Sequence, residues 1–168
     1  AARENPEKSV ADNIPAFKAV YAEVAKRAED AGVKVAFENW PGGFGGYPLK
    51  GFTMAYTPDA WRRMFDAVPS KSLGLEFDPS HLYWQGIDHM AALRQFADRV
   101  YHVHAKDTEV FPDKRNAVGI YGDDWWTYRI PGLGAIDWPE FVAGLHTRGY
   151  AGGICIEHED FRFDCLRK

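Results

Sequence analysis

The chain has 168 residues, of which 46% are apolar, 26% charged and 15% aromatic. This composition is typical of one soluble globular domain and argues against a disordered, collagen-like or membrane protein. Lys and Arg number 20 against 24 Asp and Glu, a net charge of -4, so the chain lacks the cationic field that attracts nucleic acid. Without an apolar span or signal core, we expect a cytoplasmic protein with no nucleic-acid or membrane partner, whose two cysteines are reduced thiols.

The first third of the chain alternates helix and strand. Apolar residues at helical spacing predict a helix over residues 12–31, which Gly32 ends. Residues 33–38 are predicted as a strand, and the glycine-rich loop over 39–56 as a flexible flap. Thr57 then caps a second helix, which ends near residue 69.

The same alternation continues to the end of the chain. The predicted elements are a strand at 73–78, a helix at 88–98, a strand at 100–104, a loop at 106–136, a helix at 138–147 capped by Asp137, a last strand near 153–158 and an irregular tail at 159–168. Alternating strands and helices predict an α/β fold with parallel strands joined by helical crossovers. No repeat or linker divides residues 1–168, so we expect a single domain.

The strands alternate apolar residues with small or polar ones. Phe37 and Val35 share one face of their strand, for example, while Glu38 lies on the other. An open doubly wound sheet would bury both faces in aliphatic residues. One apolar and one polar face fit a barrel whose interior has a polar mouth, although such strands also occur at sheet edges. The chain is thus predicted as a partial (β/α) barrel of about four to five parallel strands with outer helices.

Each polar face ends, at the C-terminal end of its strand, in a residue able to ligate a metal. These residues are Glu38, Asp78, His104 and Glu157. The active site of a (β/α)8 barrel lies at that end, so four strands would deliver their ligands to one place. Any one of these acids alone would more often cap a turn or pair with a lysine. Together, carboxylates and an imidazole suit one divalent ion, with Mn²⁺ favoured and Mg²⁺, Co²⁺ or Zn²⁺ as alternatives.

Four segments carry a resemblance to a known family. They are V-A-F-E-N-W-P at 35–41, G-L-E-F-D-P-S-H-L at 74–82, Y-H-V-H-A-K-D at 101–107 and I-E-H-E-D at 156–160. In this order they resemble successive motifs of the sugar phosphate isomerase/epimerase family, which belongs to the xylose isomerase-like TIM barrels. The resemblance runs from about residue 5 to residue 160. It implies that the chain corresponds to the C-terminal part of such a barrel.

The resemblance also implies an activity. Glu38, Asp78, His104 and Glu157 would bind the metal, and Glu38 and Glu157 would act as acid and base on either side of a substrate carbon. Proton transfer through an enediolate would then epimerise or isomerise a sugar or sugar phosphate. His81 would contact a substrate oxygen or the metal.

Four further side chains are weaker candidates. Lys106 is predicted to stabilise a substrate oxyanion from the rim, with a solvated loop lysine as the alternative. Arg129 would clamp a carboxylate or phosphate, or simply stack on neighbouring aromatic rings. Trp126 is assigned to the substrate site. His102 shares a face with His104, and we expect it to support the metal ligands rather than to bind the ion itself.

The length is short for the expected barrel, which typically needs about 250 residues. The chain is then a fragment of a longer enzyme, a natural half-barrel, or an inactive relative that retains a metal or ligand site. We favour a half-barrel that forms a homodimer to cover its open edges, because exposed edges require a partner. A metal-dependent endonuclease of the same superfamily is less favoured, because it would need further metal ligands and a basic surface.

Overall fold

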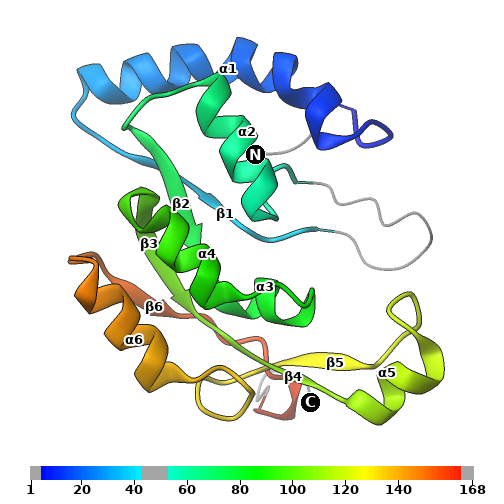
Figure 1. The fold of residues 1–168 in the computed structure, drawn as a ribbon. Helices are drawn as coiled ribbons and strands as arrows, with labels where there is room; N and C mark the ends of the chain where they lie inside the picture. The colour runs from blue at the N-terminus through cyan, green and yellow to red at the C-terminus, as the bar shows by residue number, and fades with distance from the viewer. Residues whose placement is uncertain (1–4, 43–52, 164–168) are drawn as a thin grey trace. The chain divides into compact units, whose positions relative to one another are not determined.

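The computed structural model describes residues 5–42 and 53–163, and most of the expected glycine-rich flap lies outside these ranges. The elements (Figure 1) are α1 (Val10–Asp30), β1 (Val35–Glu38), α2 (Pro58–Ala67), β2 (Leu73–Phe77), α3 (Pro79–Trp84), α4 (His89–Phe96), η1 (Ala97–Arg99), β3 (Val100–Ala105), β4 (Asp107–Val110), α5 (Pro112–Val118), β5 (Trp126–Arg129), α6 (Trp138–Thr147), β6 (Ile154–Ile156) and η2 (Phe161–Phe163). None of the helices in the described part of the chain combines the length and apolarity needed to cross a membrane.

The chain forms two compact units. The first comprises Ala1–Phe77 and Asp98–His102, and the second comprises Asp78–Ala97 and Val103–Lys168. The parallel strands follow the order β1-β2-β3-β6, and β3 contributes residues to both units. This parallel sheet with flanking helices confirms the predicted α/β class.

In the first unit, β1 and β2 pair in parallel register, with Phe37 opposite Leu75, and α1 packs against α2. The side chains of Leu73, Leu75 and Phe77 are fully buried, as the predicted apolar face requires. Trp61 of α2 packs on Phe77, with ring centroids 5.9 Å apart. The alternation of apolar residues in β2 thus directs one face into a packed core.

The ends of α1 differ slightly from the prediction. The helix begins at Val10 because the Ser9 hydroxyl caps it by accepting a hydrogen bond from the backbone N–H of Asp12. At the other end, Gly32 has a φ of 65°, and the N–H of Val33 donates to the carbonyl of Ala28. Val33 is therefore part of the helix cap, and β1 starts two residues later than predicted.

In the second unit, α4 packs on α6, and α3 packs on β4. Asp88 and Asp137 cap α4 and α6 by accepting hydrogen bonds from the backbone N–H of Ala91 and Glu140. The predicted cap at Asp137 is confirmed, while the helix predicted at 88–98 is shorter and begins at His89. Phe141 and Leu93 are buried at the centre of this unit.

The loop predicted at 106–136 is wrong in part, because it contains regular structure. β4 and β5 form an antiparallel pair in which Asp107 lies opposite Arg129. In the sequence, α5 follows β4 and precedes β5. The sequence also missed α3, which begins directly after β2 because Asp78 caps it. These elements are short, and a strand of four residues gives little alternation for sequence analysis to detect.

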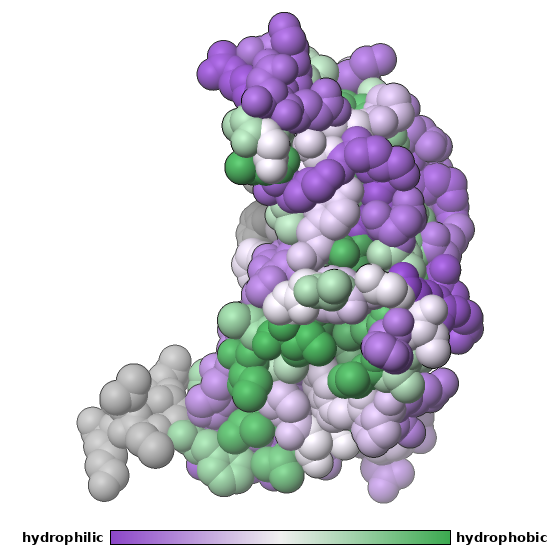
Figure 2. Space-filling model, turned by 90° about the vertical axis from the view of Figure 1, so that its left-hand side faces the viewer, coloured by the Kyte–Doolittle hydropathy of each residue, from purple (hydrophilic) through white to green (hydrophobic). Residues whose placement is uncertain are grey.

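β6 is shorter than predicted and is exposed along its whole length. Ile154 and Ile156, the isoleucines of this strand, expose 45% and 73% of their surface. Figure 2 views the side on which α6 and β6 lie and shows hydrophobic surface on this part of the second unit. Cys155 of the same strand is a free, exposed thiol, while Cys165 lies outside the described residues.

Candidate metal centre

Asp78 lies between the end of β2 and the start of α3, where it is the N-cap residue. Its carboxylate is completely buried. Oδ1 accepts hydrogen bonds from the backbone N–H of Ser80 at 2.8 Å and from the Ser80 hydroxyl at 2.6 Å. The other oxygen, Oδ2, lies 3.3 Å from Nε2 of His81 and 3.3 Å from Nζ of Lys106. Helix capping thus fixes Oδ1 and leaves Oδ2 directed at His81 and Lys106.

His104 and Glu157 are brought together by the parallel pairing of β3 and β6. His104 lies opposite Cys155 in this register, and the N–H of Glu157 donates to the carbonyl of Ala105 at 3.2 Å. Nδ1 of His104 lies 3.0 Å from Oε2 of Glu157. Asp78, His104 and Glu157 each offer one ligand atom, and these atoms lie within 4.8 Å of one another. Three of the four predicted ligands are therefore neighbours in one unit.

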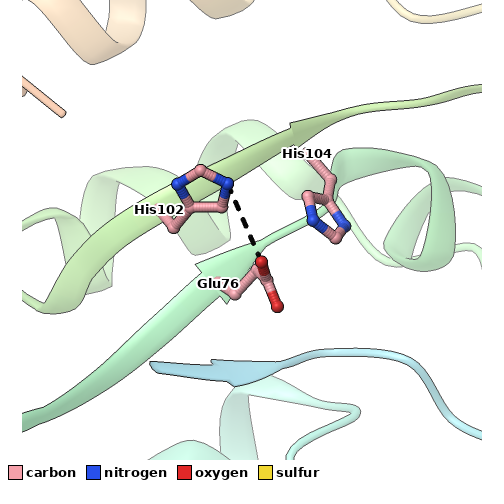
Figure 3. A group of neighbouring side chains, drawn as sticks. All are labelled: Glu76, His102 and His104. Carbon is pink, nitrogen blue, oxygen red and sulfur yellow. Dashed lines mark ion pairs between the residues drawn. The ribbon is translucent and has the colours of Figure 1, made fainter. Parts of the chain in front are cut away.

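Glu38, the fourth predicted ligand, is the last residue of β1 and belongs to the first unit. His102 belongs to that unit as well, and Figure 3 shows it beside Glu76 of β2, with Nε2 of His102 3.8 Å from Oε1 of Glu76. His102 thus lies within ion-pair distance of a carboxylate on the neighbouring strand. Its role in supporting the metal ligands remains a prediction.

Lys106 is buried, with only 1% of its surface exposed, although the sequence left open a solvated loop position. Nζ lies 2.7 Å from Oε2 of Glu157, 3.1 Å from Oε2 of Glu159 and 4.6 Å from the centroid of the Tyr128 ring. Burial alone would lower the pKa of Lys106, but Asp78, Glu157 and Glu159 together raise it above its ordinary value. The ammonium group is therefore charged at neutral pH and neutralises part of the acidic cluster.

His81 is fully buried, and its ring is held from both sides. The Tyr128 hydroxyl lies 2.9 Å from Nδ1, and Asp78 faces Nε2. Burial raises the pKa of Tyr128, and the charge of Asp78 adds to that rise. Tyr128 therefore stays protonated and can donate to Nδ1, which places the proton of a neutral His81 on Nε2, facing Asp78.

Aromatic rings extend outward from Tyr128. Trp126 makes an edge contact with Tyr128, with centroids 4.9 Å apart, and stacks on Trp84 at 4.5 Å with an interplanar angle of 5°. Trp84 and Trp126 are both partly exposed. Trp126, predicted in the substrate site, thus connects the partly exposed Trp84–Trp126 stack to the buried Tyr128 ring. Sequence analysis missed Trp84, because nothing in its local pattern distinguishes it from a packed helix residue.

Arg129 is 7% exposed and has carboxylate partners of its own. Its Nε donates to Glu109 at 2.8 Å, and one terminal nitrogen lies 3.3 Å from Oδ1 of Asp160. Asp160 also accepts hydrogen bonds from the side chain of Arg162, which lower its pKa to about 2. The structure therefore places Arg129 in an ion-pair network that holds the segment after β6, and its role as an anion clamp remains a prediction.

Asp107 is a structural residue that sequence analysis missed. It is fully buried, and its two carboxylate oxygens accept five hydrogen bonds. The donors are the backbone N–H groups of Thr108, Gly132, Gly134 and Ile136 and the indole N–H of Trp138. A Cβ on Gly134 would collide with Oδ1 of Asp107. The glycine-rich loop before α6 was the available signal, since its backbone donors require a buried acceptor.

Comparison with known proteins identifies relatives over most of the chain. The family model described as xylose isomerase-like TIM barrel matches residues 1–164. The uncharacterised protein YfiH of Bacillus subtilis is 30% identical over 88% of this chain and 46% of its own length. An inosose dehydratase of Clostridium beijerinckii is 27% identical over 81% of this chain and 44% of its own length.

Two solved structures are also similar. A D-tagatose 3-epimerase-like protein is 25% identical, with a TM-score of 0.66, over 91% of this chain and 51% of that protein. The IolI protein with a bound zinc atom is 26% identical, with a TM-score of 0.63, over 94% of this chain and 51% of that protein. The chain thus spans about half the length of the relatives it matches. On the match of its whole described length to the family model, it belongs to the xylose isomerase-like TIM-barrel family.

Proposed function

We propose that this chain carries the metal site and the proton-transfer residues of a metal-dependent sugar or sugar-phosphate isomerase or epimerase. The observation that carries the proposal is the convergence of Asp78, His104 and Glu157, whose ligand atoms lie within 4.8 Å of one another. Residues from separate strands meet there at the C-terminal ends of the strands, which is where barrel enzymes place their catalytic residues.

The donor set suits a divalent ion. Two carboxylates and one imidazole match the preferences of Mn²⁺, Co²⁺ or Zn²⁺, and their combined charge favours a dication. Asp78, His104 and Glu157 would hold the ion, and Glu38 remains the fourth ligand that the sequence leads us to expect. Mn²⁺ is our first expectation, and the zinc atom of the IolI structure makes Zn²⁺ the second ion to test. Bound there, the ion would polarise a substrate carbonyl and acidify the neighbouring C–H bond.

The carboxylates supply the proton transfer. Glu157 would remove a proton from the carbon next to the carbonyl. A second acid, the role expected of Glu38, would return one to the opposite face of that carbon, which inverts it. Return of the proton to the former carbonyl carbon would instead exchange an aldose for a ketose. The side chain of Glu157 is 31% exposed, so it can reach a bound substrate.

Three neighbouring groups would orient the sugar. Lys106 can donate to a substrate oxygen on which negative charge develops. His81 is fully buried with Nε2 facing Asp78, so it would donate to a second oxygen only if Nε2 left Asp78. Trp126 offers an aromatic face for the C–H groups of the sugar, and Arg129 would bind a phosphate only if it left Glu109 and Asp160.

The relatives support the substrate class. Their names include inosose dehydratase, inosose isomerase and D-tagatose 3-epimerase-like protein, all of which refer to sugars or cyclic polyols. We infer a polyhydroxylated carbonyl compound as the substrate and a cytoplasmic location, where such metabolites occur.

Proton exchange in D₂O tests the proposal. With Mn²⁺ added, the chain should introduce deuterium next to the carbonyl of at least one ketose or inosose, as detected by NMR. Glu157→Gln should abolish the exchange, while Glu140→Gln on the exposed face of α6 should leave it unchanged. If the chain binds the metal but exchanges protons in none of the sugars of a broad panel, the enzymatic role is contradicted.

A second candidate is a non-catalytic half-barrel that binds a metal or ligand and self-associates. The exposed apolar surface of β6 and η2 favours association, because Ile156 and Phe161 expose 73% and 65% of their surface. β6 is the terminal strand of the sheet among the described residues. A second copy is the occupant we propose, because the terminal strand of a sheet can pair with the same strand of another chain.

A further inference from the structure

The ammonium group of Lys106 is surrounded by negative charge. Oε2 of Glu157, Oε2 of Glu159 and Oδ2 of Asp78 lie at 2.7, 3.1 and 3.3 Å from Nζ, and the lysine is 1% exposed. The Tyr128 ring adds a cation–π contact. This lysine therefore binds the cluster as a cation, in a setting where water screens the charges weakly.

Two of these three oxygens belong to the proposed metal ligands. In Asp78, Ser80 donates twice to Oδ1, and Oδ2 is the oxygen that faces Lys106. In Glu157 the same oxygen that contacts Lys106 also lies 3.0 Å from Nδ1 of His104. The lysine thus contacts one carboxylate oxygen of each of two proposed metal ligands. Glu159 differs, since it is no predicted ligand and its side chain is 43% exposed.

We propose that Lys106 competes with the metal ion for the oxygens of Asp78 and Glu157, and that Glu159 holds the ammonium group when the ion binds. The inference rests on the proposed metal site. A divalent ion binds carboxylate oxygen at about 2.0–2.2 Å, so one oxygen cannot serve both cations without strong repulsion. The ion would repel the ammonium group from these two oxygens, and Glu159 is a carboxylate that the ammonium group already contacts and that is no proposed ligand.

The competition has a chemical use. An ammonium group displaced from Glu157 leaves that carboxylate free to act as a base, and it stays close enough to meet a substrate oxygen. The ammonium group of Lys106 and the metal ion would then contact different atoms of the substrate. Glu159 acts only through Lys106 and is a positioning residue.

The two residues are expected to affect metal affinity in opposite directions. Lys106→Met removes the competitor, so Mn²⁺ should bind about tenfold more tightly than to the wild type. Glu159→Gln removes the alternative partner of the ammonium group. The lysine then stays on the oxygens of Asp78 and Glu157, so Mn²⁺ should bind about threefold more weakly. A simple loss of local structure would weaken binding in both variants.

Isothermal titration of the full chain with Mn²⁺ tests the proposal. The double variant Lys106→Met/Glu159→Gln separates a role through Lys106 from a direct effect of the Glu159 charge. If Glu159 acts through the lysine, adding Glu159→Gln to Lys106→Met should change the Kd by less than about twofold. Lys114→Met, on the exposed surface of α5, is the matched control and should bind Mn²⁺ like the wild type.

Thermal unfolding supplies a second readout. Lys106→Met leaves three carboxylates without their cation, so it should melt at a lower temperature than the wild type, and Mn²⁺ should raise its melting temperature by more. If this variant does not fold, Glu159→Gln alone decides, and unchanged or tighter Mn²⁺ binding in it overturns the proposal. Equal or weaker binding in a folded Lys106→Met variant also overturns it. Absence of Mn²⁺ and Zn²⁺ binding in every variant refutes the metal site itself.

Discussion

The hydroxyl of Tyr128 lies 2.9 Å from Nδ1 of His81, and both side chains are buried. This contact lets the protein fix the proton of His81 on the nitrogen that faces Asp78. Tyr128 thus contacts Trp126 on one side and, through His81, Asp78 on the other.

Tyr128→Phe should destabilise the protein by about 1–3 kcal/mol, because it removes the hydrogen bond between the hydroxyl and a buried imidazole nitrogen. Urea unfolding measures this loss. The ¹⁵N chemical shifts of His81 should change as well, since the tautomer is no longer fixed. Tyr83→Phe is the control, and similar losses in both variants would remove the special role of Tyr128.

Asp107→Asn should be among the most destabilising single substitutions in the second unit. The asparagine amide has one acceptor oxygen, whereas the donors in the wild type share the two carboxylate oxygens of Asp107. Some backbone N–H groups around Gly132 and Gly134 therefore lose their acceptor. We expect a loss of about 2–4 kcal/mol in the free energy of unfolding. Asp123→Asn, at an exposed position, should cost less than about 0.5 kcal/mol. A small effect at Asp107 would show that the loop does not depend on this carboxylate.

Asp160 predicts a specific pH dependence. Its pKa in the folded chain is about 2, lowered from 3.8 chiefly by hydrogen bonds from Arg162. A depressed pKa stabilises the fold above the unfolded value, and this stability is lost as the pH falls from about 4 towards 2. Asp160→Asn should therefore be less stable than the wild type at pH 7, and the difference should shrink at pH 3. Urea unfolding at both values checks this, and a constant difference would contradict the assigned pKa.

The exposed surface of β6 predicts self-association. Ile156→Lys places a charge on the most exposed apolar residue of the strand and should shift the chain from dimer to monomer in light scattering. Val142→Lys changes an apolar residue of α6 that is 45% exposed and should leave the dimer intact. A wild-type monomer at all concentrations would refute association through β6.

Sequence analysis predicted the elements that carry their own signals. Thr57 followed by Pro58 begins α2, and Asp137 begins α6, because caps are local and involve residues three positions apart. The positions of Asp78, His104 and Glu157 at strand ends were also readable, since alternation sets the face on which each side chain lies.

Contacts between distant residues were out of reach. Lys106 reads as a loop lysine until Glu157 and Glu159, more than fifty positions later, are placed beside it. Asp107 likewise finds most of its donors 25 to 31 positions further along the chain. Such pairings depend on tertiary packing, and no local pattern of charge or hydropathy encodes them.

Titration of the chain with Mn²⁺ tests the central claim most directly. The wild type should bind one ion per chain, and His104→Gln, which removes the imidazole without disturbing a helix cap, should bind it at least about tenfold more weakly. His146→Gln, on the exposed side of α6, should bind like the wild type. Equal Mn²⁺ affinity in the wild type and His104→Gln would contradict a metal centre built on Asp78, His104 and Glu157.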